Sequence, residues 1–404
     1  MKSDWKNVSL GEVARVFNGK TPSKAEQRSE GHPVLKIRDV SELGEYRGKF
    51  ESFVDVELAA KFPEKRVRDG DTLILNAAHN ADYVASKTYH AQPSTFGALA
   101  TGEWLIVRPG EKSLDGGFVH HWVTSTHTRR ELRELVNGIH LYPKDVARLK
   151  IPLPPLAEQR RIAEVLDRAE ALRAKRRAAL AQLDALTQSL FLDLFGDPVA
   201  NERKWPVQAV NGFVAGFESG KSIVADDEAD TTSPYRVLKV SAVTSLEFRP
   251  EQSKPMPPGY EPPQSHIVRP GDLLFSRANT SELIGATAYV EATPPNLLLP
   301  DKLWRFVWHK AAKADPHFVR FLFQQPKFRQ EISQRASGTS GSMKNISQDK
   351  VLTIRTGLPP LPLQREFARR VTAVESLKTA QRASLAELDA LFATLQHRAF
   401  RGEL

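Results

Sequence analysis

Two short Gly-Lys segments are the first candidates for chemistry, because glycine and lysine together can bind phosphate. Residues 14–21 (ARVFNGKT) and 215–222 (AGFESGKS) both fit a loosened phosphate-loop pattern, in which four residues separate Ala or Gly from Gly-Lys-Thr/Ser. A nucleotide-hydrolysing loop needs a buried strand before it and a helix after it. Pro22 follows the first copy directly, and Ile223 is a poor start for a helix after the second. We therefore predict that Lys20 and Lys221 contact a phosphate backbone and hydrolyse nothing.

Other catalytic patterns fit poorly. No Asn/Asp-Pro-Pro-Tyr/Phe tetrapeptide of an amino-methyltransferase occurs, and Pro300-Asp301-Lys302 lacks the Glu-x-Lys or Asp-x-Lys partner of a nuclease core. His120, His121 and His127 have apolar residues around and between them, so a solvated or capping histidine face is favoured over a metal site. The sequence predicts a non-catalytic chain without a metal.

Polar and basic residues suited to bases and phosphates gather in loops at matching places in both halves of the chain. Arg and Lys can pair with guanine edges, and Asn with adenine, whereas ordinary loop polarity explains any one of them alone. The predicted DNA-binding residues are Lys20, Lys36, Arg38, Asn76, His79, Asn80, Lys87, Asn137, His140, Lys221, Lys239, Ser276, Arg277, Asn279, Thr280, Ser342, Lys344 and Asn345.

Composition agrees with a polyanionic partner. The chain has 404 residues, 57 Lys+Arg against 48 Asp+Glu and a formal net charge of +9, which favours nucleic acid. It has no cysteine, so disulfides and thiolate metal sites are excluded and a reducing compartment is favoured. No apolar run of membrane length and no signal peptide are seen, so we expect a cytoplasmic location and no membrane partner.

The elements that carry these loops are duplicated. Residues 153–195 and 358–400 align at a constant offset of 205 without a gap, and 19 of 43 positions are identical. Each copy opens with Leu-Pro-Pro, and proline suits the start of a helix but not its interior. Phe195-Gly196-Asp197-Pro198 ends the first copy with a glycine cap and a proline stop. Each copy is therefore predicted to be one long helix.

Both helices show the alternating three- and four-residue steps of a coiled coil. Matched registers favour an antiparallel pair related by a pseudo-twofold axis over two unrelated surface helices. The predicted seam is Ile162, Val165, Ala169, Leu172, Arg176, Ala179, Leu183, Leu186 and Leu190 in the first copy and Phe367, Val374, Leu377, Leu388, Leu391 and Leu395 in the second. Charged residues between these positions are placed on a solvated face: Arg173, Lys175, Arg177 and Glu375.

The segments before each helix resemble one another more faintly. Residues 67–74 (VRDGDTLI) correspond to residues 268–275 (VRPGDLLF), and β-branched stretches bounded by Gly-Asp or Pro-Gly predict strands. Around residues 118–136 and 317–335, the spacing of the apolar residues becomes that of a helix. Each variable half is therefore expected to be a mixed α/β or α+β domain of about 150 residues.

This order resembles the specificity subunit of type I restriction-modification systems over the whole chain. Leu-Pro-Pro-Leu-x-x-Gln-Arg leads a long helix twice, and Val-x-x-Gly-Asp-x-Leu occurs in both variable halves; Pro362-Leu363 departs from Ala157-Glu158 in the second copy. The resemblance implies an α/β (α+β) fold with two similar target recognition domains separated by two long antiparallel coiled-coil helices. Its segments would be target recognition domain 1 (1–152), the central conserved helix (153–197), target recognition domain 2 (198–357) and the C-terminal conserved helix (358–404).

The resemblance also implies partners. Each domain would read one half of a bipartite, asymmetric site in double-stranded DNA. Two modification subunits with S-adenosylmethionine would methylate adenines, and two motor-nuclease subunits would add ATP- and Mg-dependent translocation and cutting, with no cofactor on this chain. The spacer or partner-binding residues would be Gln159, Ile162, Leu172, Leu183, Leu186, Leu190, Gln364, Phe367, Leu377, Leu388, Leu391 and Leu395.

Two other functions remain open at this point. A DNA-recognition adaptor of the same architecture could serve a solitary methylation or phage-defence system, and a gene neighbourhood without a motor-nuclease would favour it. A coiled-coil assembly scaffold without a DNA role would be favoured by the absence of duplex binding even at low salt. The sequence contains no residue-to-base code from which a target could be derived.

Overall fold

The computed structural model of the chain describes residues 5–110, 113–221, 233–311, 313–338 and 343–404. The chain divides into two compact units. Unit 1 comprises Met1–Ala179 and Gln381–Leu404, and unit 2 comprises Leu180–Ala380. Each unit therefore contains one variable segment and parts of both long helices, so the four segments marked along the sequence are not themselves the compact units.

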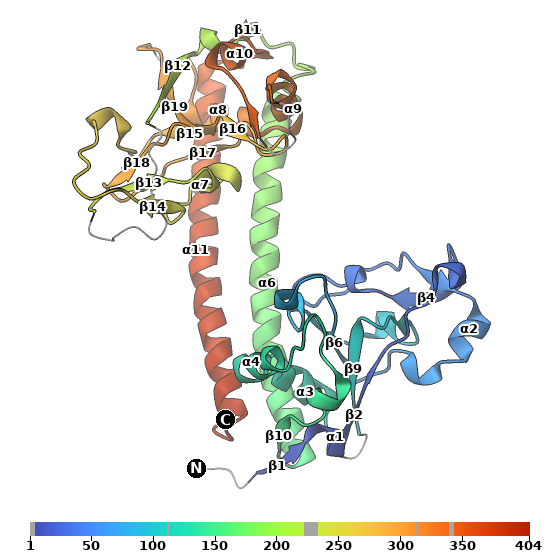
Figure 1. Ribbon diagram of the computed structural model, residues 1–404. Coiled ribbons are helices and arrows are strands. Elements are labelled where there is room, and N and C mark those ends of the chain that lie inside the picture. Colours follow the sequence, from blue (N-terminus) through green and yellow to red (C-terminus); the bar gives the residue numbers. More distant parts are fainter. Residues whose placement is uncertain (1–4, 111–112, 222–232, 312, 339–342) are drawn as a thin grey trace. The chain divides into compact units, whose positions relative to one another are not determined.

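Unit 1 is built on a four-stranded antiparallel sheet in the order β2-β9-β6-β7 (Figure 1). A second sheet has the order β3-β5-β4-β8, and β1 pairs with β10 at the start of the conserved helix. The strands are β1 (Lys6–Ser9), β2 (Ala14–Asn18), β3 (Gln27–Arg28), β4 (His32–Leu35), β5 (Phe53–Val54), β6 (Thr72–Leu75), β7 (Thr88–His90), β8 (Leu99–Ala100), β9 (Trp104–Pro109) and β10 (Lys150–Leu153). The short helices are α1 (Leu10–Val13), α2 (Val56–Ala60), α3 (Gly116–Val123), α4 (Thr126–Glu134) and α5 (Pro143–Val146).

Unit 2 repeats this plan. Its main sheet has the order β12-β19-β15-β17, a smaller sheet has the order β14-β13-β18, and β11 pairs with β21 as β1 does with β10. The strands are β11 (Val207–Ala209), β12 (Val214–Ser219), β13 (Arg236–Leu238), β14 (Ser253–Pro255), β15 (Leu273–Ser276), β16 (Ala278–Asn279), β17 (Thr287–Tyr289), β18 (Leu297–Leu298), β19 (Leu303–Trp308), β20 (Lys344–Asn345) and β21 (Arg355–Gly357). The helices are α7 (Ser241–Thr244), α8 (Pro316–Gln324), α9 (Pro326–Arg335) and α10 (Gln348–Leu352). The predicted helical stretches and the α+β class are thus confirmed.

The repeated Gly-Asp motif makes the same turn before the central strands β6 and β15. Gly70 and Gly271 have φ of +75° and +92°, a backbone region that favours glycine. The side chain of Asp71 accepts a hydrogen bond from Arg68 N at 2.8 Å, as Asp272 does from Arg269 N at 2.8 Å. Each carboxylate also pairs with an arginine of the neighbouring strand. The motif is therefore structural in both units.

The long helices are α6 (Leu156–Phe195) and α11 (Leu361–Ala399). Gly196 has φ of +73°, so the predicted glycine cap of α6 is confirmed. No helix in the described part of the chain is long and apolar enough to cross a membrane. Within each unit, the two long helices run antiparallel. In unit 1, Arg173 pairs with Asp389 and Arg176 with Gln381, so residues later in α6 contact residues earlier in α11.

The predicted seam is wrong at two positions of each helix. Leu172 and Leu186 are 54% and 47% exposed, and their counterparts Leu377 and Leu391 are 54% and 51% exposed. The positions one residue later face the seam instead: Leu166, Arg173, Leu180 and Thr187 on α6, and Val371, Lys378, Leu385 and Phe392 on α11. The sequence pattern fits both registers because they share Ile162, Ala169, Arg176, Leu183 and Leu190. The structure adopts the register that buries two cationic side chains. Hydropathy alone would disfavour this register.

Those two cations form equivalent ion networks. Arg173, with an 18% exposed side chain, pairs with Glu170 on its own helix and with Asp389 of α11 at 2.6 Å. Lys378, with a 6% exposed side chain, pairs with Glu375 on its own helix at 3.1 Å and with Asp184 of α6 at 2.6 Å. The prediction that Arg173 and Glu375 lie on a solvated face is therefore wrong. The aspartate of each shared Leu-Asp-Ala-Leu compensates a cation of the other helix.

The glutamine of each Leu-Pro-Pro-Leu-x-x-Gln motif is fully buried and makes one arrangement twice. Gln159 Oε1 accepts from Asp115 N at 2.8 Å, and its amide donates to Pro154 O at 2.9 Å. Gln364 Oε1 accepts from Asp315 N at 2.9 Å, and its amide donates to Pro359 O at 2.7 Å. Asp115 and Asp315 are the N-caps of α3 and α8. Each glutamine thus joins a conserved helix to a variable domain.

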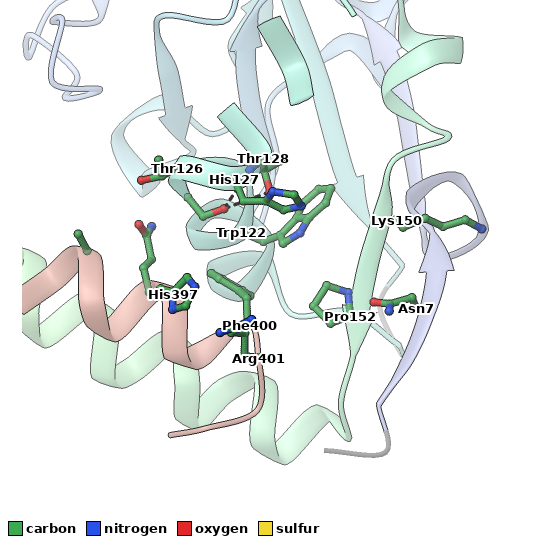
Figure 2. Close-up of a pocket in the computed structure, with 13 residues that line it drawn as sticks. Asn7, Trp122, Thr126, His127, Thr128, Lys150, Pro152, His397, Phe400 and Arg401 are labelled. Atoms are coloured by element: carbon green, nitrogen blue, oxygen red, sulfur yellow. Dashed lines mark hydrogen bonds between the residues drawn. The ribbon is translucent and has the colours of Figure 1, made fainter. Parts of the chain in front are cut away.

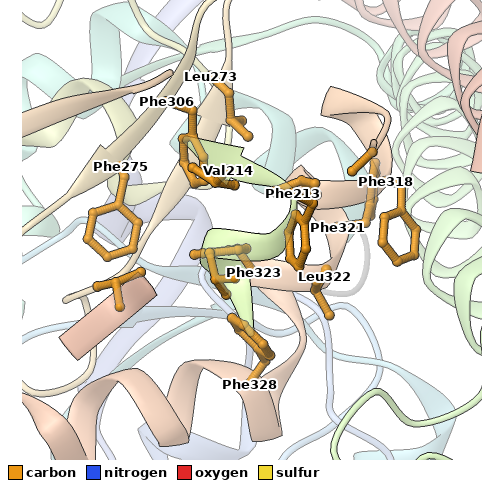
Figure 3. Close-up of a cluster of buried hydrophobic side chains, with 14 of the residues drawn as sticks. Phe213, Val214, Leu273, Phe275, Phe306, Phe318, Phe321, Leu322, Phe323 and Phe328 are labelled. Carbon is orange, nitrogen blue, oxygen red and sulfur yellow. The ribbon is translucent and has the colours of Figure 1, made fainter. Parts of the chain in front are cut away.

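The core of unit 2 is rich in phenylalanine (Figure 3). Phe318 of α8 packs edge-to-face on Phe195, the last residue of α6, with ring centroids 4.8 Å apart. Phe118 of α3 packs in the same way on Phe400 in unit 1, at 5.2 Å. The phenylalanine that closes each repeat is therefore part of the core of a variable domain.

Candidate nucleic-acid interface

A surface groove of about 820 Å³ in unit 1 brings together five of the predicted DNA-binding residues. They come from two segments that follow strands. Lys36 and Arg38 follow β4, and His79, Asn80 and Lys87 lie in the loop between β6 and β7. The wide, largely apolar floor with polar residues around it is suited to an extended ligand with flat apolar faces.

The β4 side of the groove is fixed by a buried aspartate. Asp39 is 3% exposed, and its carboxylate accepts a hydrogen bond from Lys36 N at 2.8 Å. Burial raises the pKa of Asp39, although this hydrogen bond and the Arg38 guanidinium oppose that rise. The Arg38 side chain is 58% exposed, with Glu51 at 3.5 Å. The guanidinium also donates to Ser52 Oγ at 3.2 Å, so the exposed Arg38 side chain is held at the edge of the groove, where it can meet a base edge or a phosphate.

The loop after β6 presents exposed side chains. His79 and Asn80 are exposed, and Asn80 Oδ1 accepts from Asp82 N at 3.0 Å, which shapes the turn. Tyr83 is 61% exposed and Ile139 is 43% exposed, and both line the groove. Sequence reasoning missed Tyr83 and Ile139, because their exposure follows from the tertiary structure. Large exposed apolar side chains beside basic ones are suited to contact with stacked or splayed bases.

Two predicted DNA contacts are occupied inside the fold. Asn76 is 3% exposed, and its amide donates to Asn18 Oδ1 at 2.9 Å and to Gly102 O at 3.0 Å. Lys87 is 5% exposed, and its ammonium donates to Val40 O at 3.0 Å and pairs with Glu42 at 2.8 Å. Both side chains therefore support the groove from within and do not project from it.

The Gly-Lys segments differ from a phosphate loop. A Cβ on Gly19 would lie 2.2 Å from Thr101 O, and one on Gly220 would lie 1.7 Å from Leu299 O, so glycine is required by close backbone packing. Gly19 N donates to Trp104 O and Lys20 N to Ala100 O. These amides are therefore not available to cradle a phosphate. The side chains of Lys20 and Lys221 are exposed and remain candidates for phosphate contact.

The equivalent loops also come together in both units. Ala77 bridges to His140 in unit 1, and Ala278–Asn279 pairs with Lys344–Asn345 in unit 2. Asn137, His140 and Asn345 are exposed, whereas Lys239, Asn279, Thr280 and Lys344 are half-buried. Ser342 lies outside the described residues.

Two further predicted residues of unit 2 serve its own fold. Ser276 is fully buried, so its side chain does not reach the surface. Arg277 Nε donates to Asp301 O at 2.7 Å, and its guanidinium lies 3.5 Å from the Asp301 carboxylate. Asp301 of the Pro-Asp-Lys segment is thus a structural partner of Arg277.

The histidines also differ from the sequence interpretation. His121 is 3% exposed and lies 2.7 Å from Asp167, whereas the His127 side chain is 68% exposed. His120 packs on His90 and on His121, with ring centroids 5.0 and 5.4 Å apart. The prediction of a solvated face is therefore wrong for His121. In the part of the chain that the structure describes, no three His, Asp or Glu side chains are placed to hold a metal ion.

No family model matches the chain, but individual relatives do. It is 24% identical to the type I restriction enzyme EcoKI specificity subunit of Escherichia coli (strain K12), over 99% of this chain and 89% of that relative. It is 22% identical to the MjaVIII specificity subunit of Methanocaldococcus jannaschii, over 93% of this chain and 87% of that relative. The chain is thus similar, over nearly its whole length, to specificity subunits of type I restriction enzymes.

Solved structures agree on the fold. One neighbour, from a study of complex assembly and conformational transition in a type I restriction-modification system, has a TM-score of 0.55 with 19% identity and full coverage of both chains. The specificity subunit from M. genitalium has a TM-score of 0.57 with 13% identity, covering 98% of this chain and 96% of that chain. The likeness shows the fold: two similar α+β units and two long helices.

Proposed function

We propose that this chain is the DNA-reading specificity subunit of a type I restriction-modification complex, and that its two units read the two halves of a bipartite, asymmetric site. The observation that carries the proposal is the duplicated unit, in which the segments after β6 and β15 each pair with a later loop and which in unit 1 places exposed Arg38, His79 and Asn80 around one groove. The homology to specificity subunits supports it independently.

The chain would have no catalytic role of its own. Adenine methylation would be carried out by two modification subunits that bind S-adenosylmethionine, and translocation and cutting by two motor-nuclease subunits that use ATP and Mg. The complex would act in the cytoplasm. Four leucines support a role of the helices in this assembly: Leu172 and Leu391 in unit 1 and Leu186 and Leu377 in unit 2 are exposed at equivalent positions of the two repeats. Such apolar exposure on paired helices is suited to docking.

The test is single-molecule mapping of adenine methylation in host DNA with and without the gene. We expect one asymmetric bipartite motif to lose methylation when the gene is deleted. A chain whose deletion leaves the methylome unchanged, and which binds no duplex at low salt, would instead be an assembly scaffold. Methylation that depends on the gene in a host without a motor-nuclease subunit would identify the solitary-methylation adaptor.

A further inference from the structure

A second cavity, of about 420 Å³, lies in unit 1 where α11 meets the start of α4 (Figure 2). Its apolar part is formed by Trp122, Phe400 and Pro152, which face one another across the cavity in Figure 2. Trp122 is 3% exposed, so its ring is held rigidly by the fold. We call this cavity the α4–α11 pocket.

The ionisable residues that line this pocket are all basic. His127, Lys150, His397 and Arg401 line it, and no Asp or Glu does. The side chains of His397 and Arg401 are exposed and make no hydrogen bond or ion pair with any described residue. His127 has only Glu131 nearby, at 3.7 Å along its own helix. A pocket with an aromatic floor and uncompensated basic residues is complementary to an acidic ligand with an apolar part.

The equivalent place in unit 2 is covered by the chain itself. Lys327 at the start of α9 corresponds to His127 at the start of α4, and Asp197 places its carboxylate 2.6 Å from the Lys327 ammonium. The segment then returns over the end of α6, where Trp205 Nε1 donates to Phe195 O at 3.0 Å. Phe195 is the counterpart of Phe400. A turn-forming segment with a carboxylate therefore contacts Lys327 and Phe195 in unit 2, whereas no described carboxylate takes the corresponding place in unit 1.

The described residues after α11 do not take that position in unit 1. Glu403 N donates to Arg398 O at 3.0 Å, and Leu404 O accepts from Arg161 of α6 at 3.0 Å. These residues turn toward the first turns of α6 and leave His127 and His397 exposed.

We propose that the α4–α11 pocket binds an acidic peptide segment of a modification subunit. A carboxylate of that segment pairs with His127 and Arg401, as Asp197 pairs with Lys327, and an apolar side chain packs against Trp122 and Phe400. The inference rests on the proposed function only in assigning the segment to a modification subunit, because the chemistry of the pocket is independent of DNA recognition.

The experiment uses the full chain co-expressed with the modification subunit encoded beside it. A photoreactive p-benzoylphenylalanine replaces Ala393, which is exposed and lines the pocket, or Ala390, which is exposed on the same helix but does not line it. We expect a crosslink from position 393 to an acidic segment of the modification subunit, mapped by mass spectrometry, and none to that segment from position 390.

Charge reversal tests the recognition chemistry. His127→Glu with Arg401→Glu should abolish the crosslink and weaken assembly by about tenfold or more, because each glutamate repels the carboxylate that the pocket would bind. Lys24→Glu, an exposed reversal away from the pocket, should leave assembly unchanged. The unfolding midpoint of each variant in urea should match that of the parent chain, since the replaced side chains are exposed.

Three results would overturn the proposal: crosslinks that reach only duplex DNA, crosslinks that reach only residues 1–4 of the same chain, or assembly that is indifferent to both glutamates. The sequence preference for DNA should survive the charge reversal. A parent chain that binds no duplex would refute the proposed function whatever the crosslink shows, so the two failures can be told apart.

Discussion

At the scale of single residues, the shared motifs of the two repeats are structural, and the residues suited to DNA contact lie in the variable loops. Gln159, Gln364, Asp71 and Asp272 each stabilise a joint between backbone segments. Arg38, His79 and Tyr83 are exposed around a groove and lie outside the repeated motifs. Repeats in this chain therefore identify the framework, whereas differences between the halves identify the candidate reading surface.

The buried glutamines give a direct test of this division. Gln159→Ala leaves Asp115 N and Pro154 O without their partner and should lower the free energy of unfolding by about 1–3 kcal/mol. Gln182→Ala, on the exposed face of the same helix, should change it by less than about 0.5 kcal/mol. Urea unfolding of both variants measures the two changes in unfolding free energy. Equal changes would contradict a stabilising role of Gln159 between the helix and the variable domain.

The exposed lysines of the Gly-Lys segments should act through charge. Lys20→Ala or Lys221→Ala should weaken binding to every duplex similarly and reduce the slope of log affinity against log salt by roughly 0.9 per lost phosphate contact. Titration of matched and mismatched duplexes at several salt concentrations measures this. A changed sequence preference with an unchanged slope would show that these lysines read bases.

Buried histidines predict how the stability of the chain depends on pH. Burial lowers the pKa of His120 well below its usual value of 6.5, with nearby His90 and His121 adding to the effect, and burial also lowers the pKa of His90. The unfolded chain therefore takes up these protons at a higher pH than the folded chain. Stability should be complete above about pH 6.5 and should fall below it, by at most about 1.4 kcal/mol per pH unit for each histidine.

Urea midpoints between pH 7.5 and 5.5, above the range in which most carboxylates titrate, measure this decline. His120→Gln should flatten it, whereas His127→Gln, at an exposed position, should not. A decline that is the same in both variants would assign the effect to other groups.

At the scale of elements, the helix seam is set by packing and charge together. The register with Arg173 and Lys378 inside succeeds because Glu170, Asp389, Glu375 and Asp184 surround those cations. The cost of burying a charge is offset only when partners of this kind are present. The leucines that hydropathy placed inside are left on the outer face.

Truncation of one leucine on each face separates the two registers. Leu166→Ala removes a fully buried side chain and should cost about 2–5 kcal/mol of unfolding free energy. Leu172→Ala, at a position 54% exposed, should cost less than about 1 kcal/mol in the free chain. Leu183→Ala, at a half-buried position in both registers, should fall between them. A larger loss for Leu172 than for Leu166 would restore the register predicted from sequence.

The same Leu172→Ala variant also tests the docking role proposed for the outer leucines. Its affinity for the modification subunit should fall, although its stability is nearly unchanged. Lys175→Ala, a polar truncation on the same helix, provides the comparison.

At the scale of the whole molecule, duplication predicts modular recognition. Replacing residues 200–355 with the equivalent segment of a relative should change one half of the methylated motif and leave the other half intact, because each unit has its own sheet and core. Methylome mapping of the chimaera measures both halves at once. A chimaera in which both halves change would show that the units do not read independently.

The sequence by itself determined the order of elements, the extent of both long helices and the α+β character of the variable halves. These features depend on local signals: proline before a helix, glycine after it, and β-branched residues between Gly-Asp turns. Local signals are sufficient because each acts within a few residues of the element that it bounds. They also carried the resemblance to specificity subunits, which the relatives then supported.

Only the tertiary structure decided which side chains face outward. Asn76 and Lys87 have the same residue types as a DNA-reading surface, yet their partners are Asn18, Gly102 and Val40, which are distant in sequence. Burial depends on such long-range contacts, and no local pattern records them. The register of the helix seam and the exposure of Tyr83 were decided in the same way, because each depends on contacts between residues that are far apart in the sequence.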